Sequence, residues 1–206
     1  MNKIKVLTAL LVSVMLTGCV SVNVNIHTDS PEPVQEETGE HVQMTDIEGC
    51  DTFTQIVDRK LTKGMAYTNA PICKDGALLV AEGAYDNLDG NMAAIDAEVY
   101  IYSDGKIVYA GYAQSDGTAY PLSVKDDRLY TAGNHFVTRY AVKDEKLVVE
   151  ETAGETFDTE QNVTYYYESD DKDDSNDVDQ SEAEKKFDEL WEEYLSADIL
   201  NFDVIR

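Results

Sequence analysis

Short apolar segments joined by tight turns fill the middle of this 206-residue chain and most constrain its fold. They are rich in Val, Ile and Tyr, and turn signals such as Asp104-Gly105 separate them. The segments are 65–72, 77–85, 93–103, 106–113, 119–124, 128–133, 135–142, 146–154 and 162–169. Parallel neighbours would need connections of about a dozen residues or more, and these turns are shorter. We therefore predict an antiparallel β-meander.

One segment shows how the faces of the predicted sheet differ. Successive side chains of a strand point to opposite faces. In residues 95–102 the apolar set is Ile95, Ala97, Val99 and Ile101, and the polar set is Asp96, Glu98, Tyr100 and Tyr102. We expect a sheet packed on one face, with a wet, tyrosine-bearing face on the other side.

Helical spacing occurs before and after the strand segments. In residues 51–64, Asp51 or Thr52 can cap a helix that Gly64 ends, with one face formed by Phe53, Ile56, Val57 and Leu61. Residues 181–202 predict an amphipathic helix whose stripe is Ala183, Phe187, Leu190, Trp191, Tyr194 and Leu195. We expect this second helix to cover the apolar face, with the first beside it or at the end of the sheet. The predicted fold is mainly β (α+β), with one helix near each end of the domain.

The amino terminus indicates export. Lys3 and Lys5 precede an apolar stretch, residues 6–16, which is too short to span a bilayer because a spanning helix needs about 20 residues. Leu16-Thr17-Gly18-Cys19 resembles the bacterial lipobox. The resemblance implies that the thiol of Cys19 receives a diacylglyceryl group and that residues 1–18 are removed. The alternative is an ordinary signal peptide in which Cys19 stands by chance.

The rest of the chain divides into a tether and a domain. Residues 20–45 are polar, lack aromatic residues and contain two prolines, so we expect Cys19 and this stretch to form a lipidated, flexible tether (residues 19–45). Residues 46–206 form the single predicted domain. Stretches such as GTAYPLSVKDDRLYTAGNHFVTRY resemble uncharacterised surface lipoproteins of Gram-positive bacteria. That resemblance carries no catalytic motif and implies no activity.

Charge limits the partners. Residues 19–206 hold 14 basic and 41 acidic residues, a net charge of −27. This charge repels phosphate backbones, so nucleic acid is excluded as a partner class, whereas cations and basic partners are attracted. Two cysteines remain beside Cys19. In an extracytoplasmic setting Cys50 and Cys73 could form a disulfide, and two buried free thiols are the alternative.

Catalytic signatures are sparse. His135 is the only histidine of the predicted domain, and we interpret it as a polar residue of the sheet, next to Arg139 on the same strand face. No G-x-S-x-G motif occurs. Asp96 and Glu98 lie two apart on one strand face, about 6.5–7 Å from each other, which falls within the range of glycosidase carboxylates. In a chain with 41 acidic residues this spacing is weak evidence for an acid-pair hydrolase.

Tyrosines offer a candidate binding face. All 13 lie between Tyr67 and Tyr194. Exposed tyrosines on a sheet can stack on sugar rings or peptides, although packing in cross-strand pairs is the favoured explanation of them. The candidate contact residues are Tyr100, Tyr102, Tyr112 and Tyr166.

An acidic stretch resembles a calcium loop. Residues 171–182, DKDDSNDVDQSE, are similar to the loop of EF-hand proteins. The resemblance implies a Ca²⁺ site with ligands from Asp171, Asp173, Ser175, Asp177, Asp179 and Glu182. Asn176 stands where that family has glycine, and a strand-like segment precedes the loop where the family has a helix. The competing interpretation is an acidic N-terminal cap, with Ser181 and Glu184 as a capping box.

These patterns favour a secreted, acidic lipoprotein held by Cys19 on the outer, extracytoplasmic face of the cell membrane. We expect a non-enzymatic binding or interaction protein with a protein or carbohydrate ligand. The alternatives are a calcium-binding structural or sensory lipoprotein and, least favoured, the acid-pair hydrolase. No cofactor other than Ca²⁺ is indicated.

Overall fold

A computed structural model describes residue 41 and residues 43–171 and 178–206. The chain divides into two units, residues 1–39 and 40–206, and every described residue belongs to the second. The predicted signal peptide and Cys19 lie outside the described residues. The folded unit begins earlier than the predicted residue 46, because Thr45 is buried with 3% of its surface exposed. No helix in the described part of the chain is long and apolar enough to span a membrane.

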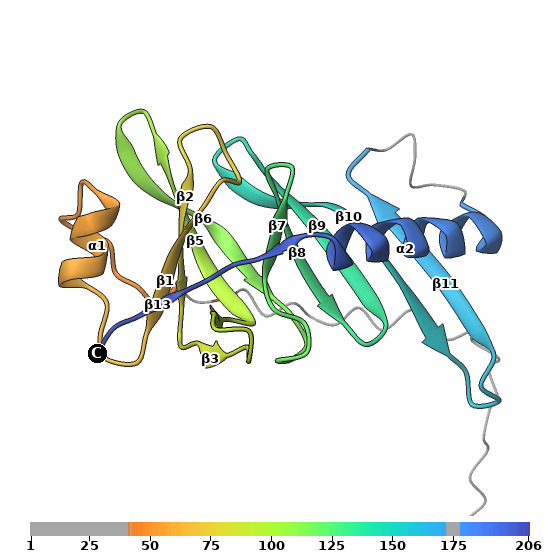
Figure 1. Ribbon diagram of the computed structural model, residues 1–206. Coiled ribbons are helices and arrows are strands. Elements are labelled where there is room, and N and C mark those ends of the chain that lie inside the picture. Colours follow the sequence, from red (N-terminus) through yellow and green to blue (C-terminus); the bar gives the residue numbers. More distant parts are fainter. Residues whose placement is uncertain (1–40, 42, 172–177) are drawn as a thin grey trace, which may run out of the picture. The chain divides into compact units, whose positions relative to one another are not determined.

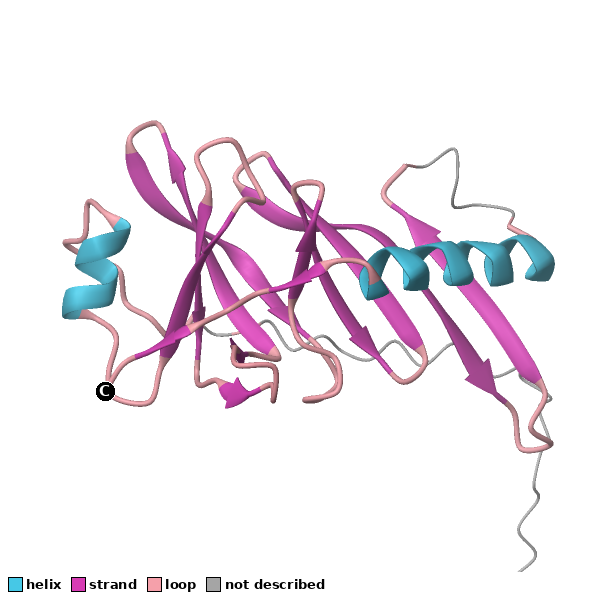
Figure 2. Cartoon of the chain, in the orientation of Figure 1, coloured by secondary structure: helices cyan, strands magenta, loops and turns pink. Residues whose placement is uncertain are grey.

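The fold is mainly β and antiparallel, as predicted, but the strands form two larger sheets rather than one (Figures 1 and 2). The first sheet has the order β13 (Asp203–Val204), β1 (Ala66–Ala70), β2 (Ala77–Ala81), β5 (Asp96–Ser103) and β6 (Lys106–Gln114). The second has the order β11 (Val163–Ser169), β10 (Lys146–Phe157), β9 (Phe136–Lys143), β8 (Arg128–Gly133), β7 (Ser123–Lys125) and β12 (Asp198–Ile199). A two-stranded ribbon, β3 (Tyr85–Asp86) and β4 (Met92–Ala93), lies between β2 and β5 in sequence.

The first sheet is covered on both faces, so the predicted wet face is wrong. All five residues of β2 are buried. On one face, Leu79 and Val99 belong to a core that the second sheet shares. On the other face, Leu78 and Tyr100 pack with Ile56 of the first helix. Glu98 and Tyr100, expected in water, are fully buried.

A C-terminal segment, residues 198–205, joins the two sheets. Its β12 pairs with β7 of the second sheet, and its β13 pairs with β1 of the first (Figure 1). Between them, the Leu200 N–H donates to the Leu122 carbonyl at 3.0 Å and the Phe202 N–H to the Met92 carbonyl at 2.8 Å. The side chains of Leu200 and Phe202 enter the shared core. One short segment therefore contributes hydrogen bonds to both sheets and apolar side chains to the core.

Each sheet carries one helix. Helix α1 (Phe53–Arg59) packs on the outer face of the first sheet, and Thr52 caps it by accepting the Gln55 N–H. Helix α2 (Gln180–Leu195) lies across the second sheet. Its N-cap is Asp179, whose carboxylate accepts the N–H groups of Ser181 and Glu182, so the predicted Ser181–Glu184 box does not form the cap. Leu195, predicted in the buried stripe, is 66% exposed.

The two cysteines of the domain do not form a disulfide. Both are free thiols, and they pack against different clusters: Cys50 against the one beneath α1 and Cys73 against the shared core. Burial raises the pKa of the Cys73 thiol, which disfavours the thiolate that oxidation requires. The suggested Cys50–Cys73 bridge is therefore wrong.

Phe202→Ala tests the role of the C-terminal segment. The side chain is 2% exposed, and truncation of a buried phenylalanine costs about 3–5 kcal/mol of unfolding free energy. We expect a loss of that size in chemical denaturation of the full chain. Ile199→Ala, in the same segment but 39% exposed, is the matched control and should cost about 1 kcal/mol or less. Equal losses for the two variants would contradict the assigned role of Phe202.

Candidate binding surface

Register places three parallel rows of side chains beneath α2. The middle row, Ala132, Val137 and Ala153, is fully buried, and its small side chains let the helix approach the sheet. Because side chains alternate along each strand, the rows two residues away emerge on either side of the helix. One row holds Tyr130, Arg139 and Glu151, and the other holds Glu155 and Tyr165. The β8–β9 turn adds Asn134, which accepts the Tyr120 hydroxyl at 2.7 Å, and His135, 3.0 Å from Glu155. We call the side of α2 with Tyr130, Arg139 and Glu151 the ion-pair flank, and the side with Glu155 and Tyr165 the aromatic flank.

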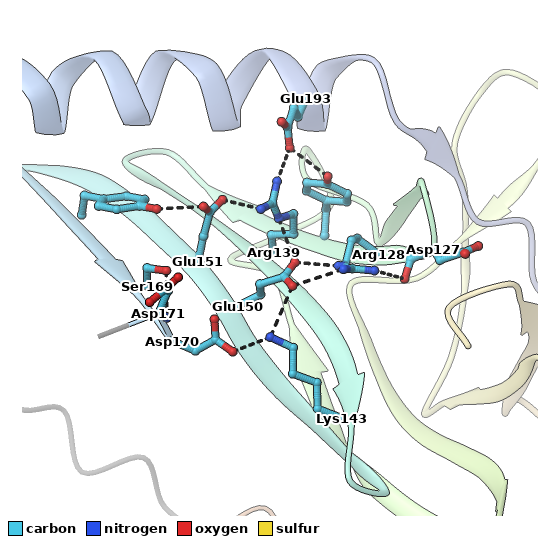
Figure 3. Close-up of polar contacts among 12 residues, drawn as sticks. Asp127, Arg128, Arg139, Lys143, Glu150, Glu151, Ser169, Asp170, Asp171 and Glu193 are labelled. Atoms are coloured by element: carbon cyan, nitrogen blue, oxygen red, sulfur yellow. Dashed lines mark hydrogen bonds and ion pairs between the residues drawn. The ribbon is translucent and has the colours of Figure 1, made fainter. Parts of the chain in front are cut away.

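Arg139 is the centre of the ion-pair flank (Figure 3). Its guanidinium lies 2.7 Å from Glu151 of β10, 2.8 Å from Glu193 of α2 and 3.2 Å from Glu150. Two tyrosine hydroxyls complete the contacts, since Tyr167 donates to Glu151 at 2.8 Å and Tyr130 to Glu193 at 3.0 Å. The helix is thus joined to the sheet by charge-assisted hydrogen bonds.

Glu150 extends the network along the sheet. A β-bulge at Val149/Glu151 interrupts the register of β10 there, and the Glu150 carboxylate accepts two hydrogen bonds from Arg128, at 2.6 and 3.2 Å. Lys143 bridges Glu150 and Asp170. The hydrogen bonds from Arg128 hold the pKa of Glu150 below its usual value. Because the chain's own cations neutralise these carboxylates, the ion-pair flank is structural.

The aromatic flank presents rings in a row. Tyr120 lies edge-on to Trp191 with centroids 6.1 Å apart, Trp191 is 5.8 Å from Phe187, and Phe187 is 6.0 Å from Tyr165. All four rings are half-buried. On the helix, Phe187 and Trp191 are one turn apart, which sets them on one side of α2.

The row continues beyond the helix onto the β10–β11 hairpin. Phe157 and Val163 form a cross-strand pair, 46% and 41% exposed. The ring of His135 meets Phe157 edge-on at 5.1 Å, and its Nδ1 lies 3.0 Å from Glu155. Rings and an exposed apolar pair therefore form one surface whose neighbours include carboxylates.

Acidic groups lie close to these rings. Burial and the negative charges of Glu184, Glu155 and Asp188 raise the pKa of the Tyr165 hydroxyl. Glu184 and Asp188 stand on the exposed side of α2 next to Phe187. The surface thus combines aromatic faces with negative charge.

The Asp96–Glu98 pair has a structural role at the other end of the domain. Glu98 is fully buried, and its carboxylate accepts the N–H groups of Met44 and Thr45, the latter at 3.1 Å. The Tyr100 hydroxyl donates to the same carboxylate at 2.7 Å. These bonds hold residues 43–46, the N-terminal strap, against the first sheet.

Asp96 and His41 complete this cluster. Asp96 accepts the Tyr112 hydroxyl at 3.1 Å, and burial raises the Asp96 pKa. The His41 ring stacks on Tyr112 at 3.7 Å, with its Nε2 3.4 Å from Glu98. The Glu98 carboxylate is thus enclosed by its own chain, a poor arrangement for an acid-pair hydrolase.

The four tyrosines predicted as a binding face do not lie together. Tyr100, Tyr102 and Tyr112 belong to the first sheet, where Tyr100 is fully buried and the other two are half-buried. Tyr166 belongs to β11 of the second sheet and is 36% exposed. It lies over Gly154, where an added Cβ would come within 2.5 Å of its hydroxyl oxygen. The predicted single face is therefore replaced by the aromatic flank, of which none of the four is a member.

The predicted calcium loop is only partly described. Asp173, Ser175 and Asp177 lie outside the described residues, as does Asn176. Of the other ligands, Asp179 serves as the N-cap of α2. Within the described ranges, no group of three or more His, Cys, Asp or Glu side chains could hold a metal ion. Calcium binding by Asp171–Glu182 stays a prediction.

Comparisons with known proteins assign no family. No protein-family model matches the chain, and searches of curated proteins and of solved structures find no significant match.

Glu150→Gln tests the ion-pair flank by its pH dependence. Because the folded pKa of Glu150 lies below its unfolded value, the ionised group stabilises the fold above the unfolded value of about 4.3. That contribution is lost as the pH falls through the folded pKa. We expect the variant to be about 1–3 kcal/mol less stable than the wild type at pH 7, with the difference shrinking below about pH 4.3.

The matched control for this titration is Glu189→Gln. Glu189 pairs with Lys185 on the exposed side of α2, so its substitution should cost about 0.5 kcal/mol or less. Urea denaturation between pH 3 and 7 gives both curves. A Glu150→Gln deficit that is constant with pH would contradict the ion-pair account.

Glu98→Ala tests the attachment of the N-terminal strap. The substitution leaves the buried Thr45 N–H without its acceptor, at a cost of about 1–3 kcal/mol, whereas the Tyr100 hydroxyl can still donate to the Thr45 carbonyl, 3.2 Å away. We expect the Thr45 amide to exchange with solvent much faster than in the wild type. Glu82→Ala, an exposed acidic residue of the same sheet region, should leave the protection of Thr45 unchanged. An unprotected Thr45 amide in the wild type would show that Glu98 does not hold the strap.

Proposed function

We propose that this protein is a lipid-anchored, extracytoplasmic binding protein without enzymatic activity, and that the aromatic flank of α2 is its contact surface. The observation that carries the proposal is the row of half-buried rings from Tyr120 to Tyr165, continued by exposed Phe157 and Val163. A row of this kind gives a ligand several rigid contacts at once.

Aromatic side chains suit this role for physical reasons. Their large faces bury much apolar area on contact, while only two side-chain torsions must be fixed. Exposed apolar surface that is contiguous, rather than scattered, is typical of interaction sites. Here the rings are fixed in place before any ligand arrives, because each is in contact with another ring of the row.

The arrangement of the polar groups favours binding over catalysis. In the best candidate acid pair, Glu98 holds the N-terminal strap and Asp96 accepts the Tyr112 hydroxyl. Arg139 is paired with three carboxylates. His135 lies at the surface beside Glu155 and Phe157, where it can contribute a polar contact to a ligand.

The cellular setting rests on the amino terminus. The sequence Leu16-Thr17-Gly18-Cys19 supports lipidation at Cys19, and two or more acyl chains suffice for stable anchoring. Residues 20–40 would then link the anchor to the domain. A binding surface on such a protein meets ligands outside the cell.

The test uses Trp191, the only tryptophan of the chain, as a reporter inside the proposed surface. The full chain, purified in nonionic detergent, is titrated with chitohexaose, octaproline and octalysine while Trp191 emission is recorded. We expect Trp191 emission to change saturably with at least one of the three probes. Phe187→Ala should weaken that binding about tenfold or more, because it removes a ring next to Trp191.

Val149→Ala is the matched control for Phe187→Ala. Val149 is 44% exposed and lies opposite Tyr140, whose side chain packs in the shared core and not under α2. Its substitution should leave the titration unchanged, and circular dichroism checks that both variants are folded. A Trp191 signal that is unmoved by every probe at millimolar concentration would contradict the proposed contact surface.

A further inference from the structure

We infer that the aromatic flank recognises a cationic ligand, a peptide segment of a partner protein bearing lysine or arginine side chains. This inference deepens the proposed function and rests on it. It names the chemical class of the ligand, which the row of rings by itself leaves open.

The first observation is the charge around the rings. Glu155 lies opposite Tyr165 on the neighbouring strand, and Glu184 and Asp188 stand beside Phe187 on α2. All three carboxylates act on the Tyr165 hydroxyl through their negative charge. An aromatic face attracts cations, and carboxylates at its edge strengthen that attraction.

The second observation comes from the other side of the same helix. On the ion-pair flank, the Lys186 ammonium lies 5.2 Å from the centroid of the Tyr167 ring, and Arg139 lies between Glu151 and Glu193. That flank thus combines tyrosine rings with carboxylates, as the aromatic flank does, and its cations come from the chain itself. The protein therefore already shows how this combination of groups binds lysine and arginine.

In the part of the chain that the structure describes, the aromatic flank has no equivalent lysine or arginine. The two lysines of α2 are directed elsewhere, since Lys185 pairs with Glu189 and Lys186 lies over Tyr167. Among the described residues, no lysine or arginine forms an ion pair with Glu155, Glu184 or Asp188. Glu155 has His135 as its neighbour at 3.0 Å. A lysine or arginine side chain from a partner would supply the missing charge.

The net charge of the chain acts in the same direction. With 16 basic and 41 acidic residues, the protein attracts basic partners over long range and repels acidic ones. This general attraction would speed encounter with any polycation. Specific recognition therefore has to be separated from it by experiment.

The experiment titrates the full chain in detergent with acetylated octalysine amide at 0.15 M salt and records Trp191 emission. Long-range attraction is screened beyond about 8 Å at that ionic strength. We expect saturable binding of octalysine and none of octaglutamate. The double variant Glu184→Lys/Asp188→Lys should weaken octalysine binding about tenfold or more.

A charge-matched variant separates the flank from the net charge. Glu48→Lys/Asp58→Lys makes the same change in net charge at exposed positions around α1, on the first sheet. It should retain the wild-type affinity. Equal weakening in the two double variants would overturn the inference by showing that octalysine responds only to net charge.

Chitohexaose, a neutral probe, distinguishes the proposed contact surface from the proposed cationic ligand. Binding of chitohexaose that Phe187→Ala weakens, with no response to octalysine, would overturn the cationic ligand while supporting the aromatic flank as a contact surface. Failure of both probes, together with octaproline, would overturn the contact surface itself.

Discussion

The structure depends most on the core that the two sheets share and that the C-terminal segment closes. Phe202 and Leu200 fill this core, while the backbone on either side of them pairs with one sheet and then the other. The segment directly follows α2, and β11 precedes that helix. Both ends of α2 are thus tied to the second sheet, which gives the helix its course across the strands.

That course divides one face of the second sheet into two chemically different sides. Small residues under the helix, such as Ala132 and Ala153, bring it close, and the rows on either side emerge beside it. On one side Arg139 forms an ion pair with Glu151, and Lys186 lies over the Tyr167 ring. On the other side rings and carboxylates stand together without a lysine or arginine from the described chain. The alternation of side chains along the strands therefore places a structural contact on the ion-pair flank and a candidate binding surface on the aromatic flank.

Local patterns in the sequence were sufficient to predict the main strands, their antiparallel pairing and both helices. They could not predict burial on both faces, because Glu98 and Tyr100 look like residues of a wet face until the strap and α1 cover them. Strands of two residues, such as β12 and β13, carry no periodicity of their own. Phe187 and Trp191 fit the core stripe of a helix, but the sheet buries Ala183, Leu190 and Tyr194 of that stripe and leaves these two rings half-buried. The candidate surface depends on that tertiary placement.

Selective quenching of Trp191 fluorescence tests this account most directly, because it requires no ligand. Caesium and iodide ions reach only exposed tryptophan, and a field of carboxylates concentrates the cation and repels the anion. The account predicts that caesium quenches Trp191 efficiently, that iodide quenches it weakly, and that Glu184→Lys/Asp188→Lys reduces the difference between the two ions. Resistance to both ions, or stronger quenching by iodide than by caesium, would contradict an open, negatively charged aromatic flank.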